Sequence, residues 1–233
     1  MVAKYQPPVV ITALGSPKPV IETVRSYGGM VFADVVNLKL ARKAADAGVD
    51  GLACISAGAG GHTGHLSPFA FISAIREFYS GRIAVGGGIS DGAGIAGAIA
   101  AGADLVYMGT RFLPTFESVA QPEYKQMVVN SDADDLIVSS VVTGTDASWL
   151  RATLEAAGID PNSPSHARNY SGKDAAKRWR DIWAAGQGLG RSKQIEPLSK
   201  IVDDLHREYT TAIERVYRVT GISMQKGLSV SPP

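Results

Sequence analysis

Two histidines lie in a glycine-rich stretch that directly follows an apolar run. The stretch is SAGAGGHTGHLSP, residues 56–68, and the histidines are His62 and His65. An imidazole takes or gives a proton near neutral pH, and glycine lets a bulky ligand approach the backbone closely. We therefore expect His62 to transfer a proton beside a bound ligand, and His65 to be exposed or to contact the start of the next helix.

Two other interpretations of this stretch compete with that one. A histidine in a loop is most often a solvated surface residue, and the flanking glycines are what favour a functional role for His62. A zinc site needs about four ligands, and no third ligand is visible near His62 and His65. The sequence therefore predicts no metal site.

Two further glycine clusters follow the next two apolar runs. They are GGG at 86–88 and the glycine of GTRF, Gly109, which has Thr110 beside it. Backbone N–H groups in such loops bind phosphate, and the Thr110 hydroxyl would add a donor. Each cluster alone is equally well explained as a tight turn, but clusters after three consecutive strands predict one shared site for a phosphate-bearing ligand.

Around these loops the chain alternates short apolar runs with helical patterns. Strands that are apolar throughout are typical of a parallel sheet covered on both faces. Strand–helix units at this spacing predict right-handed crossovers, in either an open doubly wound sheet or a closed barrel. The expected strands are 9–14, 30–33, 51–56, 83–85 and 105–108, and the expected helices end at Gly28-Gly29 or span 38–47, 67–79 and the stretch up to 101.

Helical patterns dominate the second half of the chain. We expect helices over 121–130, 147–157 and 197–219, and a surface loop over the Pro-, Ser- and Asn-rich residues 160–174. The resulting division is 1–116 for the strand–helix units with the ligand-binding loops, 117–220 for a mainly helical segment packing over them, and 221–233 for a flexible tail.

Composition excludes several classes of function. The chain has 233 residues, 45% of them hydrophobic, and a net charge of +1, so we expect a normal core and neither nucleic acid nor a membrane surface as partner. Its one cysteine, Cys54, lies in an apolar run and is expected to be a small buried hydrophobe. Without an apolar stretch long enough for a membrane span or a signal peptide, we expect a soluble cytoplasmic protein; homo-oligomerisation stays open.

Three stretches taken in order resemble the nitronate monooxygenase family, formerly called 2-nitropropane dioxygenases. They are AGAGGHTGHLSPFAF, AVGGGISDG and ADLVYMGTRFLPTFES, and the later YKQMVVNS and WRDIWAAGQGLG resemble the family's C-terminal part. The resemblance covers residues 7–219. It implies a TIM (β/α)8 barrel of which this chain would carry strands four to eight, followed by a C-terminal helical segment.

The resemblance also implies a non-covalently bound FMN and a reaction. His62 matches the family's catalytic histidine, which would deprotonate a nitroalkane or hold the nitronate anion beside the flavin. The residues that match the family's FMN-binding positions are Gly61, Gly87, Gly88, Gly109, Thr110 and Gln187. The implied reaction is oxidation of an alkyl nitronate by dioxygen to a carbonyl compound and nitrite.

The chain departs from this family in two respects. Some members carry a basic or imidazole side chain near the end of the strand that here ends in Ala33 and Asp34; we expect Asp34 to be a solvent-facing helix N-cap. About three strand–helix units that open the family's barrel are missing, which would leave residues 9–14 as an unpaired apolar edge. We therefore expect a truncated reading frame whose product binds FMN poorly and aggregates.

Three alternative functions stay open. Bacterial FMN-dependent enoyl-ACP reductases share the same motifs, so an NAD(P)H-consuming oxidoreductase is one. A flavin-free barrel enzyme acting on a phosphorylated substrate is another, although no lysine lies in the expected strands to form a Schiff base. A non-catalytic fragment that completes another protein's barrel is the third.

Overall fold

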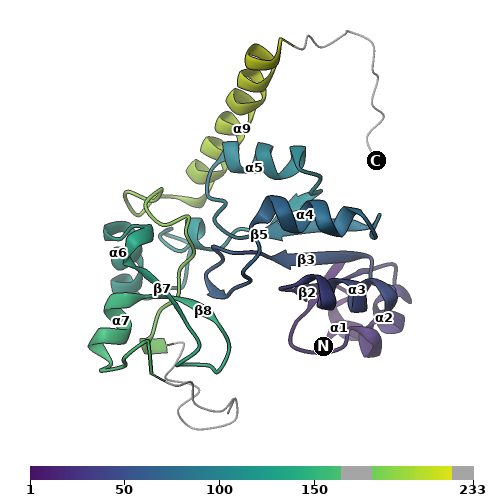
Figure 1. The fold of residues 1–233 in the computed structure, drawn as a ribbon, viewed down its shortest axis with the longest axis horizontal. Helices are drawn as coiled ribbons and strands as arrows, with labels where there is room; N and C mark the ends of the chain where they lie inside the picture. Colours follow the sequence, from purple (N-terminus) through teal and green to yellow (C-terminus); the bar gives the residue numbers. More distant parts are fainter. Residues whose placement is uncertain (164–179, 222–233) are drawn as a thin grey trace.

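The first half of the chain forms a parallel sheet with helices along one side (Figure 1). The structure is a computed structural model and describes residues 1–163 and 180–221. The sheet has five strands in the order β1-β2-β3-β5-β6, and every neighbouring pair is parallel. Its strands are β1 (Val9–Thr12), β2 (Met30–Val35), β3 (Gly51–Ile55), β5 (Arg82–Gly86) and β6 (Leu105–Val106).

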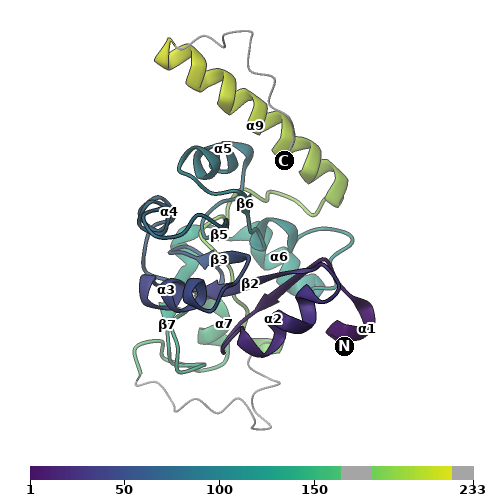
Figure 2. The ribbon, with the colours of Figure 1, turned by 90° about the vertical axis from the view of Figure 1, so that its right-hand side faces the viewer.

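Helices that connect these strands bury the outer face of the sheet. Figure 2 shows α3, α4 and α5 stacked along one side of the strands. Ser67 accepts a hydrogen bond from the Ala70 N–H and Pro68 opens the helix, as expected from the sequence. The helices are α1 (Val2–Tyr5), α2 (Lys18–Arg25), α3 (Leu38–Asp46), α4 (Pro68–Arg76) and α5 (Gly92–Ala100).

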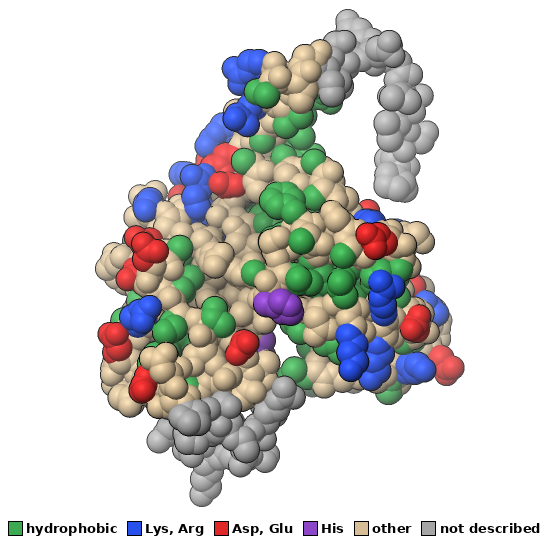
Figure 3. Space-filling view, in the orientation of Figure 1, with side chains coloured by type: hydrophobic (Ala, Val, Ile, Leu, Met, Phe, Trp, Pro, Cys, Tyr) green, Lys and Arg blue, Asp and Glu red, His purple; other side chains and the backbone are tan. Residues whose placement is uncertain are grey.

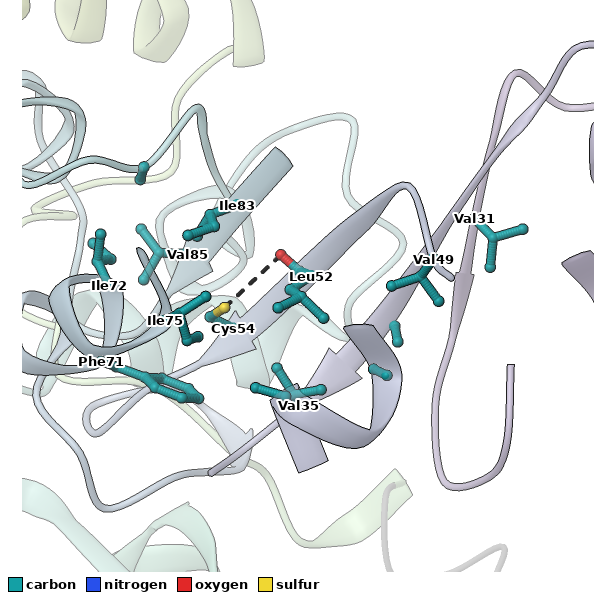
Figure 4. Packing of buried hydrophobic residues seen from close by; sticks show 14 of the residues in the cluster. Val31, Val35, Val49, Leu52, Cys54, Phe71, Ile72, Ile75, Ile83 and Val85 are labelled. Carbon is teal, nitrogen blue, oxygen red and sulfur yellow. Dashed lines mark hydrogen bonds between the residues drawn. The ribbon is translucent and has the colours of Figure 1, made fainter. Parts of the chain in front are cut away.

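The main hydrophobic core lies between these helices and the sheet. Figure 4 shows Cys54 among aliphatic side chains of the strands and of α4, with Phe71 at one side. Cys54 is fully buried, and burial raises the pKa of its thiol to about 12. The expectation that this cysteine is a packing residue is therefore confirmed.

A second, antiparallel sheet differs from the prediction for the C-terminal half. Its order is β4-β8-β7, and it joins the loop after β3 to a hairpin more than seventy residues further along the chain. The predicted helix over 147–157 is wrong in its first turn, because residues 147–150 are all buried in β8 between two partner strands. The elements are β4 (Gly61–His62), β7 (Leu136–Ser139), β8 (Ala147–Leu150) and α7 (Arg151–Ala156).

The remaining elements are three short helices that lead from β6 to β7, and a long C-terminal helix that extends away from the body (Figure 1). That helix, α9 (Leu198–Thr220), packs on α5, where Gly92 lacks the Cβ that would lie 2.1 Å from the backbone nitrogen of Tyr209. The expected tail and most of the expected loop over 160–174 lie outside the described residues. The other elements are η1 (Thr110–Phe112), α6 (Pro122–Asn130) and η2 (Ala133–Asp135).

The architecture is part of a (β/α)8 barrel, as expected. Within the described residues the sheet is not closed, because β1 and β6 are its outermost strands. The inner-face residues of these edges are half exposed: Ile11 at 48% and Leu105 at 49%. None of the described helices combines the length and the apolar character that a membrane crossing requires.

Candidate functional site

One cavity of about 450 Å³ lies at the carboxyl ends of β3, β5 and β6. This is the end of parallel strands at which α/β proteins bind ligands, and the volume is that of a small-molecule site. All three predicted glycine loops line it, through Gly58–His62, Gly86–Ile89 and Tyr107–Thr110. The molecule has two parts, one built on the parallel sheet and one built on the antiparallel sheet. Figure 3 shows a hollow between them, with histidine side chains at its border. The expectation that the loops meet at one site is therefore confirmed.

His62 is held in the wall of the cavity by strand pairing. It lies in β4, opposite Ala147 of β8, and its Nε2 is 3.3 Å from the Thr143 hydroxyl. His65, in contrast, is exposed, as expected. The imidazole is thus positioned by a hairpin distant in sequence, although the surrounding glycines alone would leave it mobile.

The glycines of the three loops have two different roles. A Cβ on Gly60 would lie 2.7 Å from the backbone of Ala185 and Gly186, and one on Gly87 would lie 2.3 Å from the Ser56 hydroxyl. These glycines allow loops to pack against each other. At Gly109 a Cβ would meet no protein atom within 4 Å, so this glycine leaves room in the cavity itself.

Comparisons with known proteins agree with this geometry. The family model for nitronate monooxygenase matches residues 1–208. The chain is 29% identical to a nitronate monooxygenase of Paraburkholderia phytofirmans, over 91% of this chain and 63% of that protein. It also superimposes on the nitroalkane oxidase of Streptomyces ansochromogenes with a TM-score of 0.80 and 25% identity, over 92% of this chain and 67% of the other.

The chain belongs to the nitronate monooxygenase family. This result confirms the resemblance noted in the sequence. A further relative, 31% identical over 79% of this chain and 50% of its own length, is a carboxyl-CoA dehydrogenase of Rhodococcus jostii. The chain thus spans 63% and 50% of these two curated relatives.

The other residues that match the family's FMN-binding positions differ in which of their hydrogen-bonding groups are available to a ligand. Gly61, Gly88 and Thr110 line it. The N–H of Gly88 donates to the Gly58 carbonyl at 3.0 Å, so Gly88 contributes space and not the phosphate donor that we expected. The Thr110 hydroxyl accepts from the Gly186 N–H at 2.9 Å, which leaves its own proton for a ligand.

Gln187 lies beside the cavity without lining it. Its side chain is exposed, and its N–H donates to the Gly58 carbonyl at 2.8 Å. The segment around it does cross the mouth of the strands, since Ala184, Gly186 and Gly188 line the cavity. In this structure Gln187 therefore anchors the segment through its backbone.

A buried ion pair fixes the GTRF loop to the C-terminal segment, which sequence analysis missed. Arg111 Nη2 is 3.0 Å from Glu196 Oε1, with the two side chains only 9% and 7% exposed. Arg111 also donates to the Ser192 hydroxyl at 3.1 Å. Burial acts to raise the pKa of Glu196, but hydrogen bonds from Arg111 and Lys200 outweigh it and lower that pKa. The pair thereby fixes the loop that carries Gly109 and Thr110.

Asp34 is the second residue that the sequence did not assign correctly. The expected N-cap role is wrong, because Asn37 caps α3 by accepting from the Leu40 N–H. Asp34 lies within β2 and lines the cavity. Its Oδ1 is buried without a hydrogen-bond partner, and burial raises the pKa of this carboxyl.

The surroundings of Asp34 make it the polar group on the cavity floor. Its neighbours across the sheet are Ala53, Ala84 and Leu105, in one continuous register. Two strand spacings separate it from β5, roughly 10 Å.

A GxSxG pattern also follows β5, at residues 88–92, but Ser90 is not positioned as a nucleophile. Its side chain is only 8% exposed, and it does not line the cavity. A Cβ on Gly188 would lie 2.6 Å from the Cβ of Ser90, so Ser90 packs beneath the C-terminal segment. The next residue, Asp91, caps α5.

An aromatic pair supports the far wall. Tyr124 of α6 stacks on Trp183 at 5.0 Å and lines the cavity. Its hydroxyl donates to the Ala184 carbonyl, and burial raises its pKa to about 12, so it remains protonated. Trp149 is fully buried in the core of the second sheet, and Trp179 lies outside the described residues.

Proposed function

We propose that this chain carries the flavin site of an enzyme that oxidises alkyl nitronates with dioxygen to a carbonyl compound and nitrite. The observation that carries the proposal is the convergence of the three glycine loops on one cavity with His62 in its wall. Membership of the nitronate monooxygenase family supports the substrate class, and the flavin is inferred to be FMN.

The residues present fit such a cofactor. Gly109 leaves open space where a side chain would otherwise stand, and the Thr110 hydroxyl has a proton to donate to a phosphate. The unpaired Oδ1 of Asp34 calls for a hydrogen-bond donor, which a ribityl hydroxyl or a ring N–H would supply. When bound, the flavin would accept electrons from the nitronate and pass them to dioxygen.

His62 is the residue suited to handle the substrate. Neither lysine nor arginine is among the described residues that line the cavity, and Asp34 is the lone carboxylate there. A nitronate is an anion, so the imidazolium form of His62 would balance its charge. With a neutral nitroalkane as substrate, the neutral imidazole would remove the proton next to the nitro group and generate the nitronate.

Apolar side chains line much of the rest of the cavity. They include Ile55, Ile89 and Leu113, and where a bound ligand displaces water from them, the attraction between the imidazolium and the substrate anion would be stronger. The protein would therefore contribute orientation and charge balance, since a nitronate already has carbanion character.

The test is a flavin spectrum together with a nitrite assay on a small alkyl nitronate. With FMN supplied in excess, we expect the wild-type chain to release nitrite in proportion to the nitronate oxidised. His62→Ala should keep the flavin absorbance and lose at least a hundredfold in turnover, the scale of general acid–base catalysis. The matched control is His65→Ala, at an exposed imidazole three residues away, which should leave both readouts unchanged. Loss of flavin binding in His62→Ala would contradict the catalytic assignment.

A second function is supported by one relative. The dehydrogenase of Rhodococcus jostii acts on a carboxyl-CoA and matches 79% of this chain. In that case the cavity would serve a thioester oxidoreductase, with His62 again as the proton-transferring group. Consumption of NAD(P)H with a thioester substrate, without release of nitrite, would select this alternative.

A further inference from the structure

Backbone pairing fixes the main chain that carries the His62 ring. Gly61 pairs with Ser148 and His62 with Ala147 across β4 and β8, and the Thr63 N–H donates to the Asp146 carbonyl at 3.1 Å. The hairpin of β7 and β8 thereby brings one of its own side chains next to the ring.

Thr143 occupies that place. It lies in the turn between β7 and β8, is only 3% exposed, and its Oγ1 is 3.3 Å from His62 Nε2. The same hydroxyl is 2.9 Å from the Thr145 carbonyl oxygen. A carbonyl can only accept and a hydroxyl has one proton, so the proton of Thr143 points to Thr145 and a lone pair faces the imidazole.

The turn that carries Thr143 is itself firmly held. Val141 and Val142 are buried and pack in one cluster with Trp149. The Gly144 N–H donates to the Ser140 carbonyl at 2.7 Å, and Gly144 has a φ of 71°, which favours glycine. The turn thus holds the backbone of Thr143, and its hydroxyl is a preformed acceptor because the Thr145 carbonyl takes its proton.

We propose that Thr143 is a positioning residue that holds His62 in the tautomer protonated at Nε2. In a neutral imidazole of this tautomer the lone pair is on Nδ1, so Nδ1 is the atom that would take the proton of a nitroalkane. The tautomer assignment rests on the geometry of the hairpin, and only its catalytic consequence rests on the proposed function. It has the logic of a base that is oriented by a third group.

The assignment is tested by ¹⁵N NMR of the chain labelled at histidine. The sequence contains 4 histidines, and His62→Gln identifies the signals of the ring. Above the pH at which that ring titrates, wild type should show a protonated Nε2 and an unprotonated Nδ1. A ring protonated at Nδ1, or a mixture of tautomers, would overturn the proposal.

Two variants and one control separate positioning from a general structural role. Thr143→Val keeps the shape of the side chain and removes the acceptor, so we expect the ring to become a mixture of tautomers; Thr143→Ser should restore the wild-type spectrum. The control is Thr153→Val, at a buried threonine that donates to Leu150 and accepts from Trp183, which should lower stability without changing the His62 signals. An unchanged His62 spectrum in Thr143→Val contradicts the proposal.

Kinetics add a readout that depends on the proposed function. Thr143→Val should lower kcat about tenfold with little change in KM, and Thr143→Ser should recover most of it. If wild type releases no nitrite but shows the single tautomer, the proposed function fails while the positioning role stands. If turnover is normal and the tautomers are mixed, the positioning role fails alone.

Discussion

The two sheets of the molecule contribute to one cavity by different physical means. The parallel sheet supplies its floor and the three glycine loops, from strands and loops that follow one another between residues 30 and 110. The antiparallel sheet supplies the setting of His62, through strands that lie between residues 61 and 150. The contribution of the parallel sheet depends on local sequence patterns. The contribution of the antiparallel sheet depends on pairing between distant segments.

Contacts between the two parts therefore decide whether the site is assembled. Gly60 packs against Ala185 and Gly186, Thr110 accepts from the Gly186 N–H, and the ion pair of Arg111 joins the GTRF loop to the C-terminal segment. The parallel sheet has a hydrophobic cluster of its own, separate from those of the second part, so we expect it to keep its core when these contacts are broken.

Replacing Arg111 by methionine should separate the two parts most strongly. It leaves Glu196 buried without its partner, at a cost of about 3–5 kcal/mol in the free energy of unfolding, measured by urea denaturation. Because the pKa of Glu196 is lowered in the folded state, this cost should be present at neutral pH and shrink as the pH falls through that lowered pKa. Arg180→Met, at an ion pair with both side chains more than half exposed, should leave the free energy of unfolding nearly unchanged, because water screens the pair.

Replacing Gly60 by alanine should force the loop of His62 away from the C-terminal segment. The new Cβ would lie 2.7 Å from backbone atoms that cannot move singly, so we expect a loss of about 1–3 kcal/mol. Hydrogen exchange should show faster exchange of the His62 and Gly186 amides, with protection of the β2 and β3 amides retained. Gly15→Ala, where a Cβ meets nothing within 4 Å, serves as the control; uniform loss of protection would show that the two parts unfold together.

Replacing Gly109 by alanine should affect the ligand and spare the fold. A Cβ there meets no protein atom within 4 Å, and the backbone φ of −119° suits alanine, so stability should stay the same or rise by up to about 1 kcal/mol. The methyl group would occupy cavity space, and we expect the Kd for FMN to rise about tenfold, or about 1.4 kcal/mol. Fluorescence titration of FMN measures this; unchanged affinity would place the ligand elsewhere.

Replacing Asp34 by asparagine should stabilise the unliganded chain. Burial raises the pKa of this carboxyl in the folded state, so its penalty is absent below its ordinary pKa of 3.8, grows as the pH rises above that value, and is complete above the folded pKa. Asp34→Asn should therefore gain about 1 kcal/mol at pH 7 and nothing at about pH 3. Asp203→Asn, at an exposed position of α9, should show no such pH dependence. An equal gain at both pH values would contradict this account.

The parallel half was predictable because its signals are local. Uninterrupted apolar runs such as Gly51–Ile55 are typical of strands buried on both faces, and Ser67 and Pro68 mark the start of α4 within a few residues. The second sheet had no such signal. Residues 147–150 are buried on both faces between β4 and β7, and a short apolar run of this kind does not by itself distinguish a strand from a helix.

The sequence also pointed to the candidate side chains of the site and left their surroundings open. The types and order of the glycines, His62 and Thr110 pointed to one ligand site, because loops after successive parallel strands share an edge of the sheet. Only the tertiary structure decided that Gly87 packs against Ser56 while Gly109 leaves space, that Asp34 faces the cavity, and that Thr143 contacts the imidazole. These properties depend on which atoms from distant segments come within a few ångströms of each other, and no local pattern of residues encodes such distances.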